Sequence, residues 1–310
     1  VAVSFEVFID CADLACTKTR LDQKSVGKAT GQLYDKLFVR HWDTWADGRR
    51  NQLFVARLGA DGKALADEPV RVSAGVDGDV PSKPFGDAGE YAWAPDGQSL
   101  VFSARLGHRE EAWSTNFDLY RAWVRARRAP QNLTAGNPAM DTGPVFSADG
   151  KTLYYRAMKR PGFEADRLAL MAMDLRSGKT REIAPAWDRS ADGIVLSADG
   201  KAIYTQAYDL GTHPLFKVDI ASGGVAKIVA DLGPALQAFL AAGGPELVIG
   251  GGVTAGNIGE IRAQLPADAA YSFHLHSAVQ RQGRLQADLL QAVLTQLKFP
   301  LSSQLSCQPG

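Results

Sequence analysis

Apolar and polar residues alternate in short runs over the first three quarters of the chain, and one such run recurs three times. It covers residues 92–105, 145–156 and 195–206, and in each copy an apolar pair leads into an Asp-Gly step. The aspartates of these steps, Asp96, Asp149 and Asp199, lie 53 and 50 residues apart. Asp-Gly is a favoured two-residue hairpin corner because it tolerates positive φ. The pattern predicts a β-hairpin that repeats about every fifty residues.

Further alternating runs follow each recurring hairpin, at 119–124, 168–175 and 215–220, and each is followed by a turn and a shorter run. Each period therefore predicts four short antiparallel strands with no helical stretch between them. Four strands per ~50 residues are typical of a β-propeller blade, which must stack on neighbours to cover its faces. Runs at 36–40, 52–57 and 69–72 indicate one earlier blade. We expect a mainly β chain with an incomplete propeller of about four four-stranded blades, which explains the recurrence better than a β-sandwich does.

The pattern changes near Gly233, where helical and extended runs begin to alternate. They predict a helix at 235–242, a strand at 246–250, a glycine loop, a helix at 258–265, a strand at 272–278 and a helix at 285–297. Residues 1–232 hold all six tryptophans and 60 of the 68 charged residues, and residues 233–310 hold eight charges. We therefore expect propeller blades over 1–232, a short α/β tail over 233–282, and an amphipathic helix with a disordered end over 283–310.

The overall charge and the missing motifs narrow the classes of function. Thirty-four Lys and Arg balance 34 Asp and Glu, which argues against nucleic acid and membrane as partners. No apolar run is long enough to span a bilayer, and no signal peptide is visible at the start of the sequence. Because the sequence opens with Val1 and not with methionine, we expect a processed chain or a fragment, periplasmic or cytoplasmic. The nucleotide and zinc motifs are missing, and no cofactor is expected.

Three strings in the first segment resemble a known family. Residues 34–45 (YDKLFVRHWDTW), 79–86 (DVPSKPFG) and 111–120 (EAWSTNFDLY) resemble the propeller domain of bacterial prolyl oligopeptidase-family serine peptidases, above all the dipeptidyl and acylaminoacyl peptidase branch. The resemblance implies a propeller that caps an α/β-hydrolase domain and admits short peptides. In that family catalysis belongs to the hydrolase domain.

The nucleophile of such a hydrolase domain needs a Gly-x-Ser-x-Gly elbow. The 310 residues contain no such string, and the 78 residues after Leu232 are fewer than the roughly 200 of a catalytic domain. We therefore expect a non-catalytic, substrate-gating or peptide-binding portion of a peptidase. Its expected partners are short peptides or a peptidase catalytic domain, and open blade edges could self-associate. The alternative is part of an active peptidase that another segment completes.

Glu110 and Glu111 are the candidate substrate contacts. The resemblance implies that propeller glutamates hold the free amine of a peptide, and paired carboxylates attract an ammonium strongly once water is removed. The alternative is a solvated acidic loop.

Residues 250–258 and 273–278 resemble the last βα units of the copper homeostasis family of (β/α)₈ barrels, which implies a copper-handling or phosphate-binding module. Gly250, Gly251 and Gly252 could bind phosphate through backbone N–H groups, or could simply join a strand to a helix. His274 and His276 share one strand face and could bind a metal, or could form an ordinary polar face.

Cys11 and Cys16 form the last candidate pair. They could close a local disulfide in an oxidising compartment or remain thiols in a reducing one.

Overall fold

A computed structural model describes most of the chain. The described residues are 1–28, 31, 33–34, 39–41, 43–60, 62, 66–107, 109–125, 128–209, 213–228, 247–250, 258–263, 271–274, 280–281, 284–285 and 287–297. They fall into two compact units, Val1–Lys227 and Ile228–Gly310. Within these ranges, none of the helices has the length and apolar character needed to cross a membrane.

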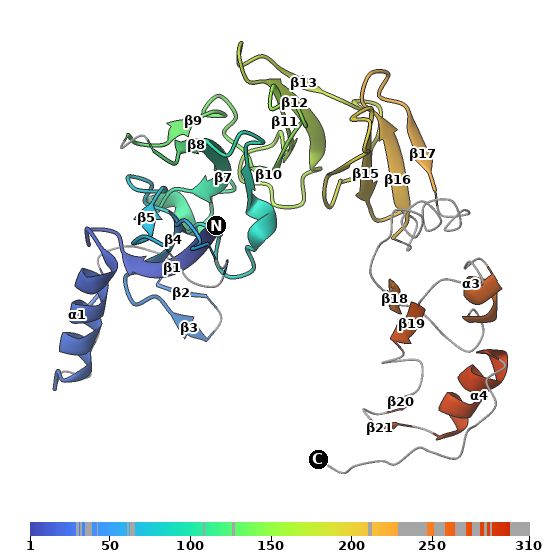
Figure 1. Cartoon of the computed structure of the whole chain (residues 1–310), viewed down its shortest axis with the longest axis horizontal. Helices are drawn as coiled ribbons and strands as arrows, with labels where there is room; N and C mark the ends of the chain where they lie inside the picture. The colour runs from blue at the N-terminus through green and yellow to red at the C-terminus, as the bar shows by residue number, and fades with distance from the viewer. Residues whose placement is uncertain are drawn as a thin grey trace. The chain divides into compact units, whose positions relative to one another are not determined.

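The first unit is built almost entirely of β-strands (Figure 1). Its elements are β1 Ala2–Phe8, α1 Leu14–Ser25, β2 Arg40–His41, β3 Thr44–Trp45, β4 Arg49–Val55, β5 Val70–Arg71, the 3₁₀ helix η1 Ala88–Glu90, β6 Tyr91–Trp93, β7 Ser99–Arg105, the 3₁₀ helix η2 Arg109–Ala112, β8 Phe117–Trp123, β9 Gln131–Asn132, β10 Asp141–Phe146, β11 Thr152–Ala157, β12 Ala169–Asp174, β13 Thr180–Glu182, β14 Val195–Leu196, β15 Ala202–Gln206, β16 Leu215–Asp219 and β17 Val225–Lys227.

Three sheets of this unit have four strands each, in the orders β6-β7-β8-β9, β10-β11-β12-β13 and β14-β15-β16-β17. Within each sheet, strands that follow one another in the chain pair antiparallel. A fourth sheet has the order β1-β4-β5. Four-stranded meandering sheets such as the first three are typical of propeller blades, whereas the fourth sheet has three strands in the described residues. The predicted fold class, an incomplete β-propeller, is confirmed.

The Asp-Gly steps do not form the predicted two-residue corners. In the first copy the N–H of Ala94 donates to the carbonyl of Ser99, and the N–H of Gly97 donates to that of Ala94, both at 2.9 Å. The connection therefore has four residues and contains a turn that ends in a left-handed glycine. Gly97, Gly150 and Gly200 share this conformation, with φ of 67°, 68° and 67°. The sequence correctly placed the hairpin but not the residues that close it.

The first blade differs from the prediction in its strand partner. β4 pairs with β1, with Val7 opposite Arg50, whereas the expected partner strand was 36–40. Residues 35–38 lie outside the described residues, and Arg40 belongs to the short β2, which pairs with β3. Because β1 lies outside the repeating motif, periodicity gave no signal for it.

The helix α1 was not predicted. The carboxylate of Asp13 caps it by accepting from the N–H of Cys16 at 2.7 Å. A disulfide joins Cys11 to Cys16, whose Cα atoms are 5.5 Å apart. Cap and disulfide together fix the start of the helix directly after β1.

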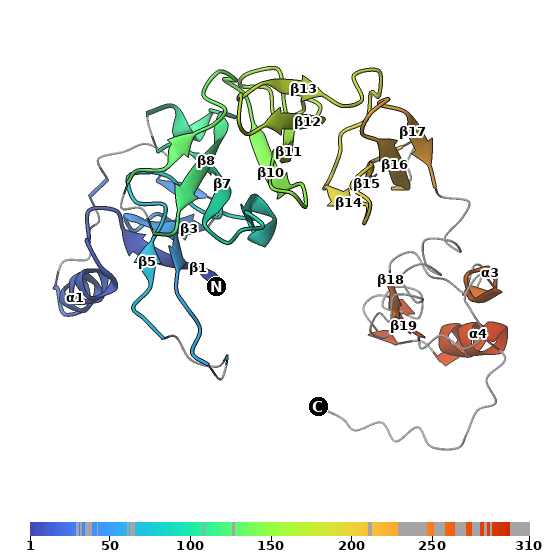
Figure 2. The same cartoon turned by 45° about the horizontal axis from the view of Figure 1, so that its top comes forward.

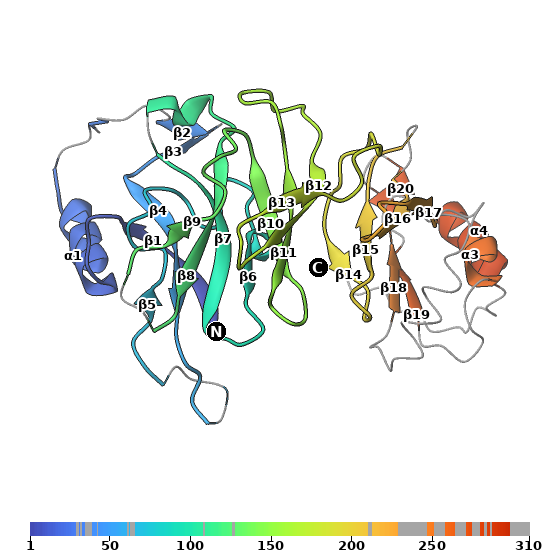
Figure 3. The ribbon, with the colours of Figure 1, turned by 90° about the horizontal axis from the view of Figure 1, so that it is seen from above.

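Neighbouring blades share their cores, as expected for a propeller. Successive side chains of a strand face opposite sides of its sheet, and Leu100 and Phe102 of β7 pack against the first blade, whereas Val101 packs against the third. In β11, Leu153 packs against the second blade and Tyr154 against the fourth. Figures 2 and 3 show these sheets following one another in chain order. Each blade thus covers a face of the next.

The second unit contains a parallel strand pair and helices. β18 Leu247–Gly250 pairs in parallel with β19 Tyr271–His274, and α3 Ile258–Ala263 lies between them in the chain. The hairpin of β20 Gln280–Arg281 and β21 Arg284–Leu285 precedes α4 Ala287–Leu297. Parallel strands with an intervening helix form a βα connection, as the apolar runs predicted. The helix expected at 235–242 lies outside the described residues.

Candidate functional site on the long-loop face

The blades have one edge of tight turns and one edge of long loops. Antiparallel order places the turns 94–98, 147–151 and 197–201 at one edge of the blades. The connections that follow β7, β11 and β15 start from the other edge, which we call the long-loop face. The N–H of Gly162 donates to Oγ1 of Thr115 at 2.9 Å and joins two of these loops across the blade boundary. Loops held on a rigid scaffold carry function more often than tight turns do.

A buried arginine organises the charges on this face at the first two blades. Nη1 and Nη2 of Arg50, at the start of β4, donate to the two carboxylate oxygens of Glu111 at 2.5 and 2.6 Å. Nη1 also donates to Asp79 at 2.9 Å, and Nε lies 3.7 Å from Asp77. The side chains of Arg50, Asp79 and Glu111 are only 17%, 10% and 6% exposed. We call these four residues the Arg50 cluster.

The carboxylates of the Arg50 cluster hold the guanidinium in its charged form. Burial alone would lower the pKa of Arg50, but the hydrogen bonds and charges of Glu111 and Asp79 raise it well above its ordinary value. A forked guanidinium suits a carboxylate because two parallel N–H groups meet two oxygens. The guanidinium of Arg50 therefore keeps its charge although it is largely buried.

Two further cations border the cluster. Nζ of Lys83 lies 2.5 Å from Glu6 and 3.8 Å from Asp79. Arg105 lies over the ring of Phe117, 5.1 Å from its centroid, and donates to the carbonyl of Ser114. Burial lowers the pKa of Arg105. These residues line a cavity of about 20 Å³, which has room for a water molecule but not for a peptide side chain.

The structure gives the two candidate glutamates different surroundings. Both belong to η2, but Glu111 is 5% exposed and bound to Arg50, whereas Glu110 is exposed. The pair therefore does not present two free carboxylates to one ligand. Glu111 anchors the short helix, and Glu110 is the one of the two that is exposed to solvent.

Of the candidate site residues in the tail, the structure describes only the backbone positions of Gly250 and His274. Gly250 ends β18 and pairs with His274 at the end of β19, so these two positions are neighbours at one end of the parallel pair. Gly251, Gly252 and His276 lie outside the described residues. Within the described part of the chain, no three His, Cys, Asp or Glu side chains gather as a metal site would require.

Sequence reasoning missed Arg50, although it found the segments that hold its partners. Asp79 and Glu111 each begin one of the strings that carried the family resemblance. Arg50 lies in no such string, and only its place three residues before the apolar run Leu53–Val55 of β4 marks it as partly buried.

Curated relatives show what this propeller is similar to. Dipeptidyl-peptidase 5 of Porphyromonas gingivalis is 30% identical over 202 residues, which are 65% of this chain and 29% of that relative. Probable dipeptidyl-peptidase 5 of Arthroderma benhamiae is 28% identical over 205 residues, 61% of this chain and 28% of that relative. The chain carries a peptidase-related propeller. The predicted resemblance to the prolyl oligopeptidase family is thereby confirmed.

This chain spans less than a third of the length of these relatives. No family model matches the sequence. Among solved structures, acylaminoacyl peptidase from Pyrococcus horikoshii is 13% identical, with a TM-score of 0.43, over 66% of this chain and 28% of that chain. TolB from Acinetobacter baumannii is 18% identical, with a TM-score of 0.41, over 58% of this chain and 38% of that chain. The fold assignment rests on the strand pairing and the shared cores described above.

Proposed function

We propose that this propeller is the non-catalytic, peptide-binding and substrate-gating portion of a dipeptidyl-type serine peptidase. The observation that carries the proposal is the 202-residue match to a dipeptidyl-peptidase. The 310 residues contain no Gly-x-Ser-x-Gly elbow, which such a serine nucleophile needs. Hydrolysis is thus assigned to a hydrolase domain, and this chain selects what reaches it.

Glu110 is the proposed contact for the free amine of a short peptide. Its carboxylate is exposed on the long-loop face, and the bond from Glu111 to Arg50 fixes the helix that carries it. An exposed ion pair in water is weak, so we expect loose binding that the approach of a hydrolase domain would strengthen by excluding water.

An activity assay tests the non-catalytic part of the proposal. The purified chain is expected to leave a dipeptidyl p-nitroanilide intact and to take up no serine-directed fluorophosphonate label. Hydrolysis that the phosphonate blocks would overturn the assignment.

A binding assay tests the amine contact. A dipeptide with a free amine should shift the backbone amide resonances of residues around η2 in an NMR titration, and its N-acetylated form should shift them less. Glu110→Gln should abolish the difference between the two peptides. Glu164→Gln, which changes an exposed glutamate of the neighbouring long loop, is the matched control and should preserve it. Equal shifts from both peptides in the parent protein would contradict an amine contact.

The relatives also favour a second candidate, in which the chain is part of an active peptidase. Because it spans 29% of the first relative, the remaining length is sufficient for a hydrolase domain. Adding the hydrolase segment of such a relative to this chain should then restore cleavage of a dipeptide substrate. A mixture that stays inactive although the two segments bind each other would contradict this candidate.

Self-association through open blade faces is a further proposal. The first and last described blades each have one face that no other described blade covers. Sedimentation velocity over a hundredfold range of concentration should show a dimer that dissociates on dilution. A constant monomer would contradict it.

A further inference from the structure

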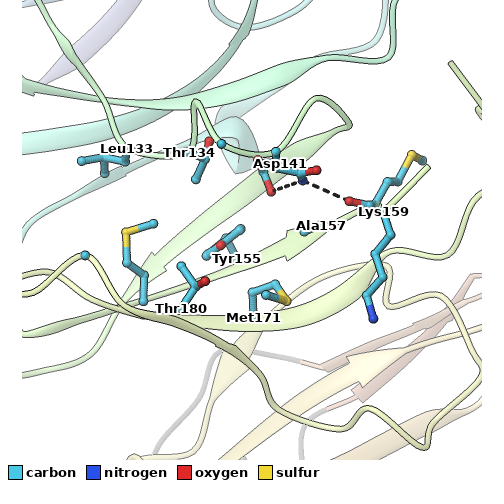
Figure 4. A pocket seen from close by; sticks show the side chains of 13 residues that line it. Leu133, Thr134, Asp141, Tyr155, Ala157, Lys159, Met171 and Thr180 are labelled. Atoms are coloured by element: carbon cyan, nitrogen blue, oxygen red, sulfur yellow. Dashed lines mark hydrogen bonds between the residues drawn. The ribbon is translucent and has the colours of Figure 1, made fainter. Parts of the chain in front are cut away.

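A cavity of about 420 Å³ lies between the second and third blades, apart from the Arg50 cluster. The segment after β9 forms one wall, and β10, β11, β12 and β13 form the other (Figure 4). Much of its lining is apolar or thioether, from Leu133, Ala157, Met158, Met171 and Met173. Its volume is in the range of pockets that hold small organic ligands.

One buried carboxyl in this lining is only half satisfied. Asp141, the first residue of β10, is 1% exposed. Oδ1 accepts from Nδ2 of Asn137 at 3.1 Å, and the same amide donates to the carbonyl of Met158 at 3.0 Å. Oδ2 is buried and has no well-aligned donor among the described residues, although the nearby hydroxyl of Thr134, like the amide of Asn137, lowers the pKa of this carboxyl. A buried acceptor without a well-aligned donor is costly, so a donor from a ligand that reached Oδ2 would relieve this cost.

The cations near the cavity are engaged elsewhere. Nζ of Lys159 is 2.6 Å from Glu182. Arg156 stands between Tyr155 and Ala157 in β11, and alternation directs it to the opposite side of the sheet, where Nη1 donates to the carbonyl of Ala191. Burial is the main cause that raises the pKa of Asp141 to about 7, and the charge of Asp118 in the neighbouring blade raises it further. The cavity thus combines an apolar lining with one buried carboxyl that has no cationic partner among the described residues.

We propose that this cavity binds a small apolar primary ammonium compound, whose N–H₃⁺ group donates to Oδ2 of Asp141. Its hydrocarbon part would lie against the three methionines, whose unbranched thioether chains adapt to different ligand shapes. An ammonium is favoured over a neutral hydroxyl because it also compensates the charges of Asp141 and Asp118. The site is separate from the peptide contact proposed at Glu110 and stands independently of it.

Two ligands of the same shape test the proposal. 2-Phenylethylamine and 2-phenylethanol are titrated into the whole 310-residue chain at pH 7.5 and followed by calorimetry. We expect saturable binding of the amine and at least about tenfold weaker binding of the alcohol, since a charge-assisted hydrogen bond is about twice as strong as a neutral one. Equal affinities, or no saturable binding of the amine, would overturn the proposal.

A variant locates the site. Asp141→Asn keeps the shape and an acceptor for Asn137 but removes the charge, and it should weaken amine binding at least about tenfold while leaving that of the alcohol unchanged. Asp199→Asn, in a turn of the fourth blade, is the matched control and should bind like the parent protein. Unchanged amine binding by a folded Asp141→Asn variant would also overturn the proposal.

A measurement on the parent protein covers the case in which that variant does not fold. Because Asp141 is partly protonated near neutral pH, binding of the ammonium must release protons, and the observed heat must depend on the ionisation enthalpy of the buffer. The other titratable groups facing this carboxyl are Asp118 and Tyr155, and Tyr155 stays neutral because burial raises its pKa. Amine binding with no proton release at pH 7 would contradict a contact with Asp141.

Discussion

The Arg50 cluster and the Asp141 cavity both bury acidic side chains, but only the cluster gives them a cationic partner. At the cluster, the guanidinium of Arg50 donates hydrogen bonds to the carboxylates of both Glu111 and Asp79. At the cavity, Asp141 accepts from the amide of Asn137, lies near the hydroxyl of Thr134 and has no cationic partner among the described residues. A carboxylate with a guanidinium partner stabilises the fold as an anion, whereas one without a cation is easier to bury as an acid. The first arrangement suits a permanent anchor and the second a binding site.

Removing the cation at the Arg50 cluster should lower the stability more than any other substitution described below. Arg50→Met keeps much of the aliphatic stem but leaves Glu111 and Asp79 buried without a partner, so the free energy of unfolding should fall by about 3–5 kcal/mol. Urea denaturation at pH 7 measures it. A loss below about 1 kcal/mol, typical of exposed pairs, would show that the cluster is better solvated than its burial indicates.

Removing the charge at the cavity should change how stability depends on pH. The pKa of Asp141 is raised from 3.8 to about 7 in the folded protein, so the folded state binds the proton more tightly than the unfolded state does. The contribution of Asp141 to the stability of the parent should therefore fall as pH rises from about 4 to 7, by up to about 4 kcal/mol, and then level off.

Asp141→Asn should be free of this loss, so the difference between variant and parent isolates it. Denaturation midpoints of both proteins across this range provide the measurement. A pH-independent difference between the two would contradict the raised pKa.

Removing the amide donor at the cavity should have a smaller effect. Asn137→Ala deprives Oδ1 of Asp141 and the carbonyl of Met158 of their donor, which should cost about 1–3 kcal/mol. Because the bond from Asn137 lowers the pKa of Asp141, its loss should raise that pKa further. An NMR titration of the Asp141 side-chain carboxyl carbon tests the direction, and a lowered pKa would contradict the assigned hydrogen bond.

Breaking an exposed ion pair should change the stability least. Arg57 donates to Asp67 at 3.0 Å through Nη2, but their side chains are 78% and 48% exposed. Arg57→Met should leave the urea midpoint unchanged within error, since water and salt screen such pairs. A loss similar to that of Arg50→Met would mean that burial does not explain the contrast.

The repeating sequence predicted the blades well because each hairpin is local. Alternation and a glycine after an aspartate determine where two strands meet, and both are visible within a dozen residues. The first blade was predicted less well, because β1 and β4 are separated by a segment that contains α1 and does not follow the repeat. Pairing across such a separation depends on packing rather than on local pattern.

The candidate site was only partly predictable for the same reason. Arg50 and Glu111 are 61 residues apart, and no local rule pairs them. Glu110 and Glu111 cannot be told apart in the sequence, and only the geometry of the 3₁₀ turn directs Glu111 towards Arg50 and Glu110 towards solvent. Asp141 follows a polar connection between blades and becomes notable only when β11 and β12 enclose it.

The shared cores of neighbouring blades have a consequence for how this protein can be divided. Leu153 and Tyr154 are adjacent in the chain but pack against different neighbouring blades. A blade therefore has no hydrophobic core of its own. A blade excised at its connections would expose two apolar faces instead of yielding an independent domain. The repeat is therefore a unit of sequence and strand order that does not fold independently, and an exchange of blades must also exchange the neighbouring faces that pack against them.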